Sequence, residues 1–176
     1  MSEAAPSAAV PRSALPSPAR WAVYGAAWAL AFAAMSLYWA AGGNVGASTL
    51  SDLVVEPARA RDPGFVAVLW LAGALKAIAA VLLLALIGRW AQWIPSWIPR
   101  VSAWIAGIAM VLYGAANLAV RAVMAVGLIP TPAAMHSRAA TWHLLLWDPW
   151  WLLGGIFFTV AAWSCTRGGT TRHRDA

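Results

Sequence analysis

Charged side chains are scarce in this chain. Asp, Glu, Lys and Arg make up only 10% of its 176 residues, and hydrophobic residues make up 62%, whereas an ordinary soluble domain carries about 25% charged residues. So little charge excludes a soluble globular protein of the usual kind. The composition instead favours a protein that lies in a membrane.

Groups that commonly bind metals or carry redox chemistry are also few. Cys165 is the only cysteine, which excludes an intramolecular disulfide, a CxxC redox pair and a cysteine metal cluster. His136 and His143 are seven residues apart, or about 10.5 Å along a helix, which is too far to bind one ion together. No P-loop, nucleophile-elbow or zincin motif occurs. We therefore expect no metal, no haem and no other cofactor.

The apolar residues are concentrated in four long blocks, at about residues 21–41, 64–88, 101–128 and 149–165. A hydrocarbon core about 30 Å thick needs about 20 helical residues to cross it. The blocks therefore predict one all-α domain, a four-helix transmembrane bundle over residues 21–165. The first block exceeds the about 7–15 apolar residues of a signal peptide, which favours a retained span over a cleaved signal.

The composition changes at both ends of the chain, and the arginines there predict its orientation. Residues 1–20 are mainly Ala, Pro and Ser and predict a disordered tail, and residues 166–176 predict a basic tail. These tails and the link between the second and third blocks hold seven arginines, whereas the other two links hold three. Because basic loops of membrane proteins face the cytoplasm, we expect both termini to be cytoplasmic.

The same distribution bears on location and partners. The basic residues are scattered and form no stripe, so we expect no nucleic-acid partner. The expected location is the cell membrane, as a multi-pass protein of a bacterial inner membrane. The expected partners are the lipid bilayer and either another membrane protein or further copies of this chain.

Proline, glycine and aspartate mark the predicted ends of the spans. Pro63 suits the first turn of the second span, where its missing N–H is harmless, and Gly127 ends the third. Asp148–Pro149 is typical of an N-cap followed by a first-turn proline, and predicts the start of the fourth span. Residues 133–147, which Thr131 could cap, form either a short interfacial helix or an extension of the fourth span through a kink at Pro149. The sequence leaves both open.

Lys76 is the most informative polar residue. It is the only lysine beside eleven arginines, and it lies in the middle of the second block. A charge at the centre of a span costs roughly 2.5–3.5 kcal/mol on insertion scales, so such residues are commonly functional. Lysine, unlike arginine, can also lose its proton when buried. Two roles for Lys76 therefore stay open, the packing of helices and the binding of a ligand or a proton.

Three polar residues of the third span are expected near Lys76. Counted at about 1.5 Å per residue from the predicted outer ends, Tyr113 and Asn117 lie close to the depth of Lys76, and Arg121 lies about 10 Å deep. Small residues share the helix faces of Lys76 and Asn117, which predicts a common seam where these two side chains meet. Lys76, Tyr113, Asn117 and Arg121 are thus the expected ligand-binding residues.

No Asp or Glu lies within the four blocks, so Lys76 has no carboxylate partner at its own depth. It would be a neutral amine bonded to Asn117, Tyr113 or backbone carbonyls, an ammonium in a wet cavity, or an ammonium facing an anionic ligand or a partner subunit. Arg121 is expected to pair with Asp148 at the outer boundary, as a structural contact.

Two segments carry a resemblance to a known family. The first is Tyr38-Trp39-Ala40-Ala41-Gly42-Gly43-Asn44-Val45-Gly46, followed by Thr49-Leu50, and the second is the Trp-rich run Leu145–Gly155 around Asp148-Pro149. Together they resemble an uncharacterised bacterial family of four-span integral membrane proteins, known only as a domain of unknown function. The resemblance covers about residues 21–165. It implies a four-helix membrane protein, and it implies no activity and no functional residue.

Two classes of function follow from these observations. The first is a membrane protein that binds or moves a small anionic or lipophilic ligand in an inter-helix pocket around Lys76. The second is a non-catalytic structural or accessory subunit of a membrane complex, in which Lys76 and Asn117 serve helix packing. An enzyme is the least favoured class, because the spans offer no carboxylate, paired histidines or reactive thiol.

Overall fold

The computed structural model describes residues 18–50, 52–132, 135 and 137–171, and in these residues it contains only helices and loops. The long helices are α1 (Pro18–Ala40), α3 (Pro63–Ala85), α4 (Trp97–Ala125) and a continuous segment formed by α5 (Arg138–Trp142), the π-helical turn η4 (His143–Trp147) and α6 (Asp148–Thr171). All four are long and apolar enough to cross a membrane. The expected all-α class with four spans is confirmed.

The boundaries of the first and fourth spans differ from those expected. Residues 18–20, which were assigned to the disordered tail, form the first turn of α1, and the last helix continues to Thr171 rather than ending at residue 165. Residues 1–17 and 172–176 of the two expected tails lie outside the described residues.

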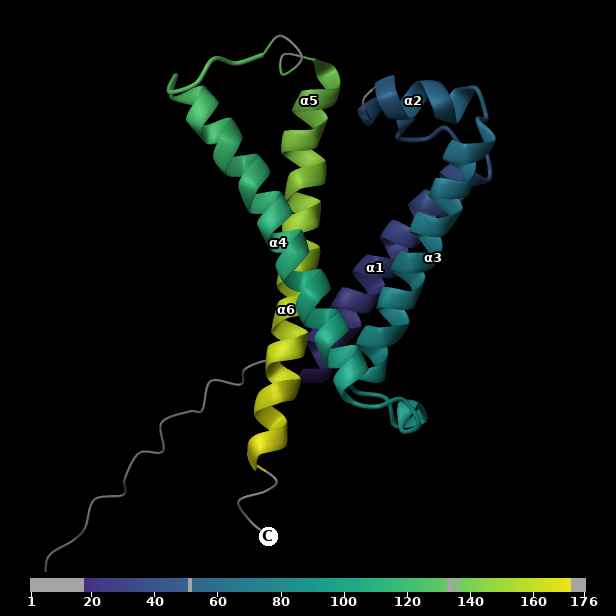
Figure 1. The fold of residues 1–176 in the computed structure, drawn as a ribbon, viewed down its shortest axis with the longest axis vertical. Coiled ribbons are helices and arrows are strands. Elements are labelled where there is room, and N and C mark those ends of the chain that lie inside the picture. Colours follow the sequence, from purple (N-terminus) through teal and green to yellow (C-terminus); the bar gives the residue numbers. More distant parts are fainter. Residues whose placement is uncertain (1–17, 51, 133–134, 136, 172–176) are drawn as a thin grey trace, which may run out of the picture.

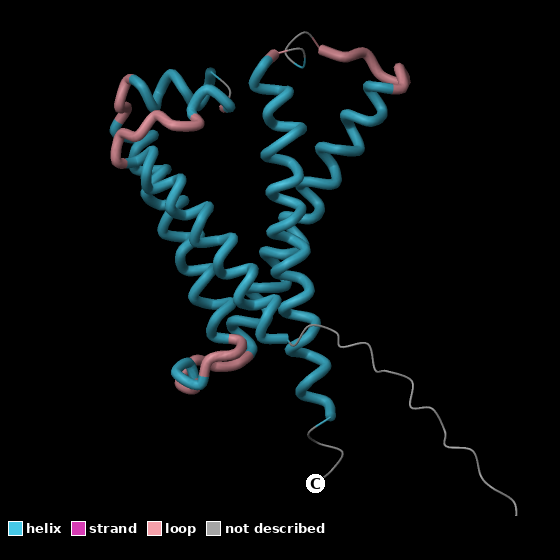
Figure 2. The backbone as a smooth tube through the Cα atoms, turned by 180° about the vertical axis from the view of Figure 1, so that it is seen from behind, coloured by secondary structure: helices cyan, strands magenta, loops and turns pink. Residues whose placement is uncertain are grey.

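The four helices form two pairs. In both views α1 runs along α3, and α4 runs along α6 (Figures 1 and 2). The pairs meet at the end where α3 and α4 are linked, through the short helix η2 (Arg89–Ala91), and they diverge toward the end that carries α2 (Asp52–Arg59) and α5. The start of α1 and the end of α6 lie at the same end of the bundle, as an even number of spans requires (Figure 1).

Glycines allow the second pair of helices to touch through their backbones. A Cβ placed on Gly155 of α6 would lie 2.7 Å from the backbone nitrogen of Val111 and 2.9 Å from the carbonyl oxygen of Gly107. The predicted small-residue face of α4 is buried at Ala103, Gly107, Met110 and Gly114. Such faces let spans approach closely in lipid. Close packing matters there because the hydrophobic effect does not drive helices together. The face is therefore correctly predicted, but it packs against α6 and not against α3.

The predicted start of the second span is confirmed. Asp62 precedes α3, and one of its carboxylate oxygens accepts a hydrogen bond of 2.8 Å from the backbone N–H of Phe65. Pro63 occupies the first turn, where no intrahelical partner for its nitrogen exists. The third span, α4, ends at Ala125, close to the predicted Gly127. Gly127 adopts a positive φ of 76°, a conformation that glycine takes without steric cost.

The predicted start of the fourth span is wrong. Asp148 lies inside a continuous helix with ordinary helical dihedrals, and its backbone N–H donates to the carbonyl of His143 across the π turn. Pro149 has no N–H, and its ring would collide with the carbonyl four residues earlier. Widening the preceding turn into a π turn relieves this conflict, and single π turns of this kind occur inside α-helices. Of the two alternatives for residues 133–147, the described residues follow the one in which this segment continues into the fourth span.

The start of this helix also corrects a predicted cap. The helix begins at Arg138, and the hydroxyl of Ser137 accepts a hydrogen bond of 3.1 Å from the N–H of Ala140. Thr131 lies in a loop six residues earlier, so Ser137 takes the capping role that was expected of Thr131.

One contact bridges the diverging ends of the two pairs. The indole N–H of Trp147 in η4 donates to the hydroxyl of Thr49, at 3.3 Å, in the short helix η1 (Ala47–Thr49). Trp147 also lies with its ring centre 6.0 Å from that of Trp39. The first link therefore connects the α1–α3 pair to the α5–α6 segment at the end where α3 and α4 stand apart.

Candidate functional site

Lys76 contacts the first helix of the bundle. Its Nζ donates a hydrogen bond of 2.7 Å to the hydroxyl of Ser36 and lies 3.8 Å from the centre of the Phe32 ring. Ser36 is only 3% exposed, and its own hydroxyl donates to the carbonyl oxygen of Phe32 at 3.3 Å. The amine therefore has one hydrogen-bond acceptor and one aromatic face, which is the favourable side of a cation–π contact.

An aromatic row connects this contact to the other pair of helices. The ring of Phe32 meets that of Trp151 on α6 at 5.1 Å and 77°, and Trp151 meets Tyr113 on α4 at 5.5 Å and 66°. Both are edge-to-face arrangements, which aromatic quadrupoles prefer. Lys76, Phe32, Trp151 and Tyr113 come from four different helices and lie in sequence across the bundle.

Tyr113 and Asn117 both lie on α4, and the ring of Tyr113 meets that of Trp151 on α6. Tyr113 is 47% exposed, and Asn117 is half-buried. In the described part of the chain no hydrogen bond joins Lys76 to either residue.

The predicted seam between Lys76 and Asn117 is therefore wrong. The face of α3 that carries Lys76 packs on α1, since a Cβ on the neighbouring Gly73 would lie 2.5 Å from the side chain of Leu37. The small-residue face of α4 packs on α6 instead. Each face was identified correctly, but the helices pair α1 with α3 and α4 with α6, so the two faces do not meet.

Arg121 and Asp148 form the ion pair that the sequence predicts. The Nε of Arg121 lies 3.5 Å from Oδ2 of Asp148. Asp148 is 1% exposed, and this oxygen has no hydrogen-bond partner among the described residues. Attraction between the two charges, rather than an aligned hydrogen bond, holds the carboxylate in the interior. That the role of this pair is structural stays a prediction.

Ser36 and Phe32 were not singled out in the sequence, although one of them had a recognisable signal. Apart from tyrosines and tryptophans, Ser36 is the only side chain with an N–H or O–H group in residues 21–41. Counting depth from the helix ends does not place Ser36 beside Lys76. Lys76 lies thirteen residues after the start of α3, whereas Ser36 lies only four residues before the end of α1. The two meet because the ends of α1 and α3 are not level.

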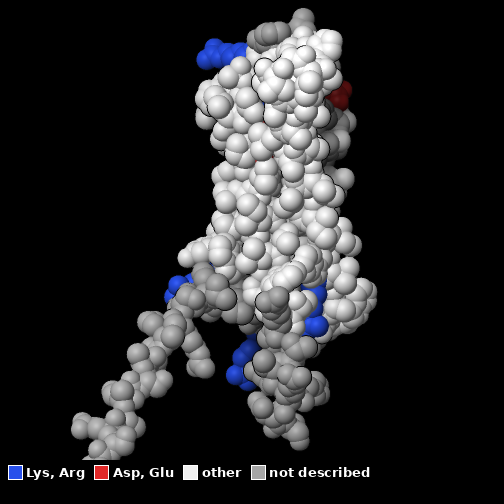
Figure 3. Space-filling model, turned by 90° about the vertical axis from the view of Figure 1, so that its left-hand side faces the viewer, with Lys and Arg blue, Asp and Glu red and all other residues white. Residues whose placement is uncertain are grey.

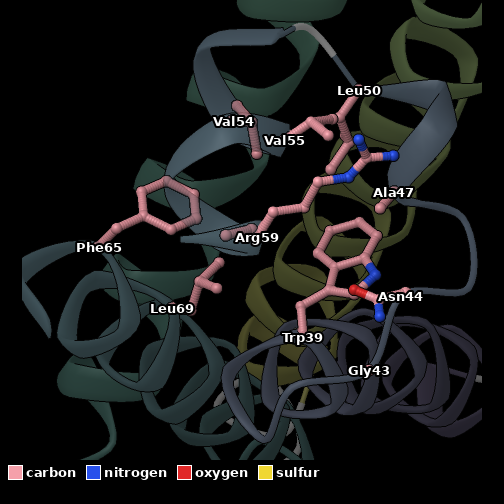
Figure 4. A pocket seen from close by; sticks show the side chains of 11 residues that line it. Trp39, Gly43, Asn44, Ala47, Leu50, Val54, Val55, Arg59, Phe65 and Leu69 are labelled. Atoms are coloured by element: carbon pink, nitrogen blue, oxygen red, sulfur yellow. The ribbon is translucent and has the colours of Figure 1, made fainter. Parts of the chain in front are cut away.

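A small and mainly apolar pocket lies at the end that carries α2. Its lining includes Trp39, Asn44, Leu50, Arg59 and Phe65, and Figure 4 shows the side chain of Arg59 extending along it. The indole of Trp39 donates to the carbonyl of Val45 at 2.9 Å. The free volume of about 10 Å³ is close to the minimum that holds one water molecule. This pocket is too small for a ligand.

The comparison with protein families is consistent with this fold. Residues 29–158 match a family described as a protein of unknown function (DUF3995). The chain belongs to this family. The match includes Lys76, Tyr113, Asn117 and Arg121, and it confirms the resemblance seen in the sequence to a domain of unknown function. No curated protein and no solved structure matches the chain. Membership of DUF3995 supplies no activity, so a role has to be argued from the geometry.

Proposed function

We propose that this protein binds a small lipophilic molecule that carries an anionic or carbonyl group, and that the amine of Lys76 contacts this group. The observation that carries the proposal is an amine in the middle of a candidate spanning helix that has one hydroxyl partner and, among the described residues, no carboxylate partner. Charged groups in spans are costly and mark ligand or ion sites more often than chance allows.

The charges of the spanning helices leave Lys76 without a counter-charge. Asp148 is the only acidic residue in the four spanning ranges, and its buried carboxylate faces Arg121. A lysine ammonium has three N–H donors, and Ser36 accepts one of them. An anionic or carbonyl oxygen from a ligand would both accept a second hydrogen bond and reduce the cost of the buried charge.

The surroundings of Lys76 suit a lipophilic body. Phe32 lies directly beneath the amine, and Trp151 and Tyr113 continue the aromatic surface toward α4. The phenol of Tyr113 is well placed to supply a further hydrogen bond, because this side chain is 47% exposed. A mostly apolar environment with a few polar groups is typical of small-molecule sites. Asn117 lies one turn further along α4 and would offer its amide to a polar group of the ligand, and Arg121 lies a further turn away, beside Asp148.

A packing role is the second candidate, and it too has a specific observation in its favour. The Lys76–Ser36 hydrogen bond joins α1 to α3, and polar contacts between spans contribute on average about 0.6 kcal/mol to association. In this role the protein would be a structural or accessory subunit of a membrane complex, and no ligand would be needed.

Lys76→Met separates the two roles in detergent-solubilised protein. We expect laurate, a carboxylate with an alkyl chain, to raise the unfolding temperature of the wild type more than that of Lys76→Met, because the variant lacks the amine that attracts the carboxylate. A ligand present at 100 times its Kd stabilises a protein by about 2.7 kcal/mol, which is readily measured by intrinsic tryptophan fluorescence during heating.

The control is Leu71→Met, which changes an exposed residue on the same helix that lines neither cavity between α3 and α4 and should keep the laurate response. Methyl laurate distinguishes a carbonyl requirement from an anionic one. A wild type that responds to neither probe, or a Lys76→Met protein that responds as strongly as the wild type, would contradict the binding role and leave packing.

A further inference from the structure

An apolar crevice opens between α3 and α4 near the end where these helices are linked. Its volume is about 200 Å³, and its lining includes Leu75, Ile78 and Leu82 of α3, Ser102 and Ala106 of α4, and Phe158 of α6. Every one of these helices is among the four candidate spans. The crevice therefore lies in the part of the protein that faces lipid chains.

A larger and more polar cavity follows directly, toward the end of the bundle. Its volume is about 380 Å³, and its lining includes Leu86, Gly88, Gln92, Ser96, Pro99 and Arg100. Leu83 lines the first cavity and Leu86 the second, and Ser102 lines the first and Pro99 the second. Three helical residues correspond to about 4.5 Å. The two cavities are neighbours along the same pair of helices.

Among the described residues, the charge at this end is of one sign. No Asp or Glu occurs between Asp62 and Asp148 in the sequence, whereas Arg89 and Arg100 both lie in this stretch near the second cavity. Figure 3 shows several groups of basic atoms at this end of the molecule, and acidic atoms together with one basic group at the other. An anionic group in the second cavity would meet Arg100 and no competing carboxylate of the described residues.

The tryptophans of the α3–α4 link place this cavity at the membrane surface. Trp90, Trp93 and Trp97 are all exposed. Tryptophan side chains concentrate where lipid headgroups meet the hydrocarbon core. The polar cavity therefore lies at headgroup level, and the apolar crevice lies one turn deeper.

From this arrangement we infer that the two cavities together bind one anionic phospholipid, with its headgroup beside Arg100 and an acyl chain in the crevice between α3 and α4. A soluble anion would use only the polar cavity, and a neutral lipid would gain nothing from Arg100. The apolar crevice and the unopposed arginine together fit an amphipathic anion. This site is separate from the aromatic row at Lys76, and the inference does not rest on the function proposed above.

The test uses the full chain reconstituted in nanodiscs with equal amounts of phosphatidylglycerol and phosphatidylcholine of identical acyl chains. Native mass spectrometry then counts the lipids that stay bound after extraction. We expect the wild type to retain mainly phosphatidylglycerol. Arg100→Gln should lower this preference about fivefold, as expected for one basic side chain near a headgroup.

Two further variants separate a built site from general surface charge. Arg89→Gln removes the same charge from the same link, but Arg89 does not line either cavity, so the preference should fall less than twofold. Ala106→Phe fills the crevice and should reduce retention of both lipids. Ser102→Leu serves the same purpose if Ala106→Phe fails to fold, as judged by its unfolding temperature.

Three results would overturn the inference. The first is a wild type without preference for phosphatidylglycerol, and the second is an equal loss of preference in Arg89→Gln and Arg100→Gln. The third is unchanged lipid retention in a folded protein whose crevice has been filled.

Discussion

Asp148→Ala is expected to lower the free energy of unfolding by about 3 kcal/mol. Removing one partner of a buried ion pair typically costs about 3–5 kcal/mol, because the other charge stays in the interior without compensation. The low end applies here, since 19% of the Arg121 side chain is exposed and can be partly solvated. Unfolding in mixed micelles, followed by tryptophan fluorescence as the fraction of denaturing detergent rises, measures this change.

A double variant tests whether the loss comes from the unpaired arginine. Asp148→Leu combined with Arg121→Met replaces the pair by apolar groups, and should recover most of the stability, because replacing a whole buried pair is often neutral. Glu56→Ala, at an exposed carboxylate of α2, is the control and should change little. A double variant as unstable as Asp148→Ala would show that the carboxylate is needed for a different reason.

Gly155→Ala is expected to destabilise the contact between α4 and α6 by about 3 kcal/mol, the upper end of the usual cost of overpacking. The added Cβ would meet two backbone atoms, Val111 N at 2.7 Å and Gly107 O at 2.9 Å. A side chain could rotate away from such a contact, but a helix backbone cannot. The two helices would have to separate along their length, and the same unfolding measurement reports the loss.

Gly64→Ala provides a matched substitution in another spanning helix. Gly64 is exposed in the first turn of α3, where the added Cβ would lie 3.2 Å from Oδ1 of Asp62. Alanine favours helix over glycine by up to about 1 kcal/mol, so this variant should be neutral or more stable. Equal effects at Gly64 and Gly155 would show that helix propensity, and not the close approach of α4 and α6, explains the result.

Features that depend on local order along the chain could be predicted well. The four apolar blocks predicted four spans, and Pro63 predicted the first turn of α3, because hydrophobic length and a missing N–H act within one helix. The fourth span was harder for a local reason. Asp148–Pro149 satisfies the pattern of a helix start, but the same pair is also compatible with a helix that passes through a π turn, and the pattern does not separate these cases.

Of the two polar contacts, one could be predicted from the sequence and the other could not. Arg121 and Asp148 could be paired from sequence, since both were placed near the outer ends of the third and fourth spans. Lys76 was assigned to Asn117 because their depths and small-residue faces matched. Its partner is Ser36 instead, a residue that lies only four positions before the end of α1 and had not been singled out.

The amino-acid sequence by itself determined that this protein has four apolar helices, which faces of α3 and α4 are small, and that one amine lies in mid-span without a carboxylate. Only the tertiary structure decided that α1 pairs with α3 and α4 with α6, and hence that Lys76 lies on Ser36 and Phe32. The physical reason is that helix faces made of small residues resemble one another, and each lets another helix approach closely in lipid. Which two of them meet depends on the close fit of their backbones and on where each helix ends relative to its neighbour.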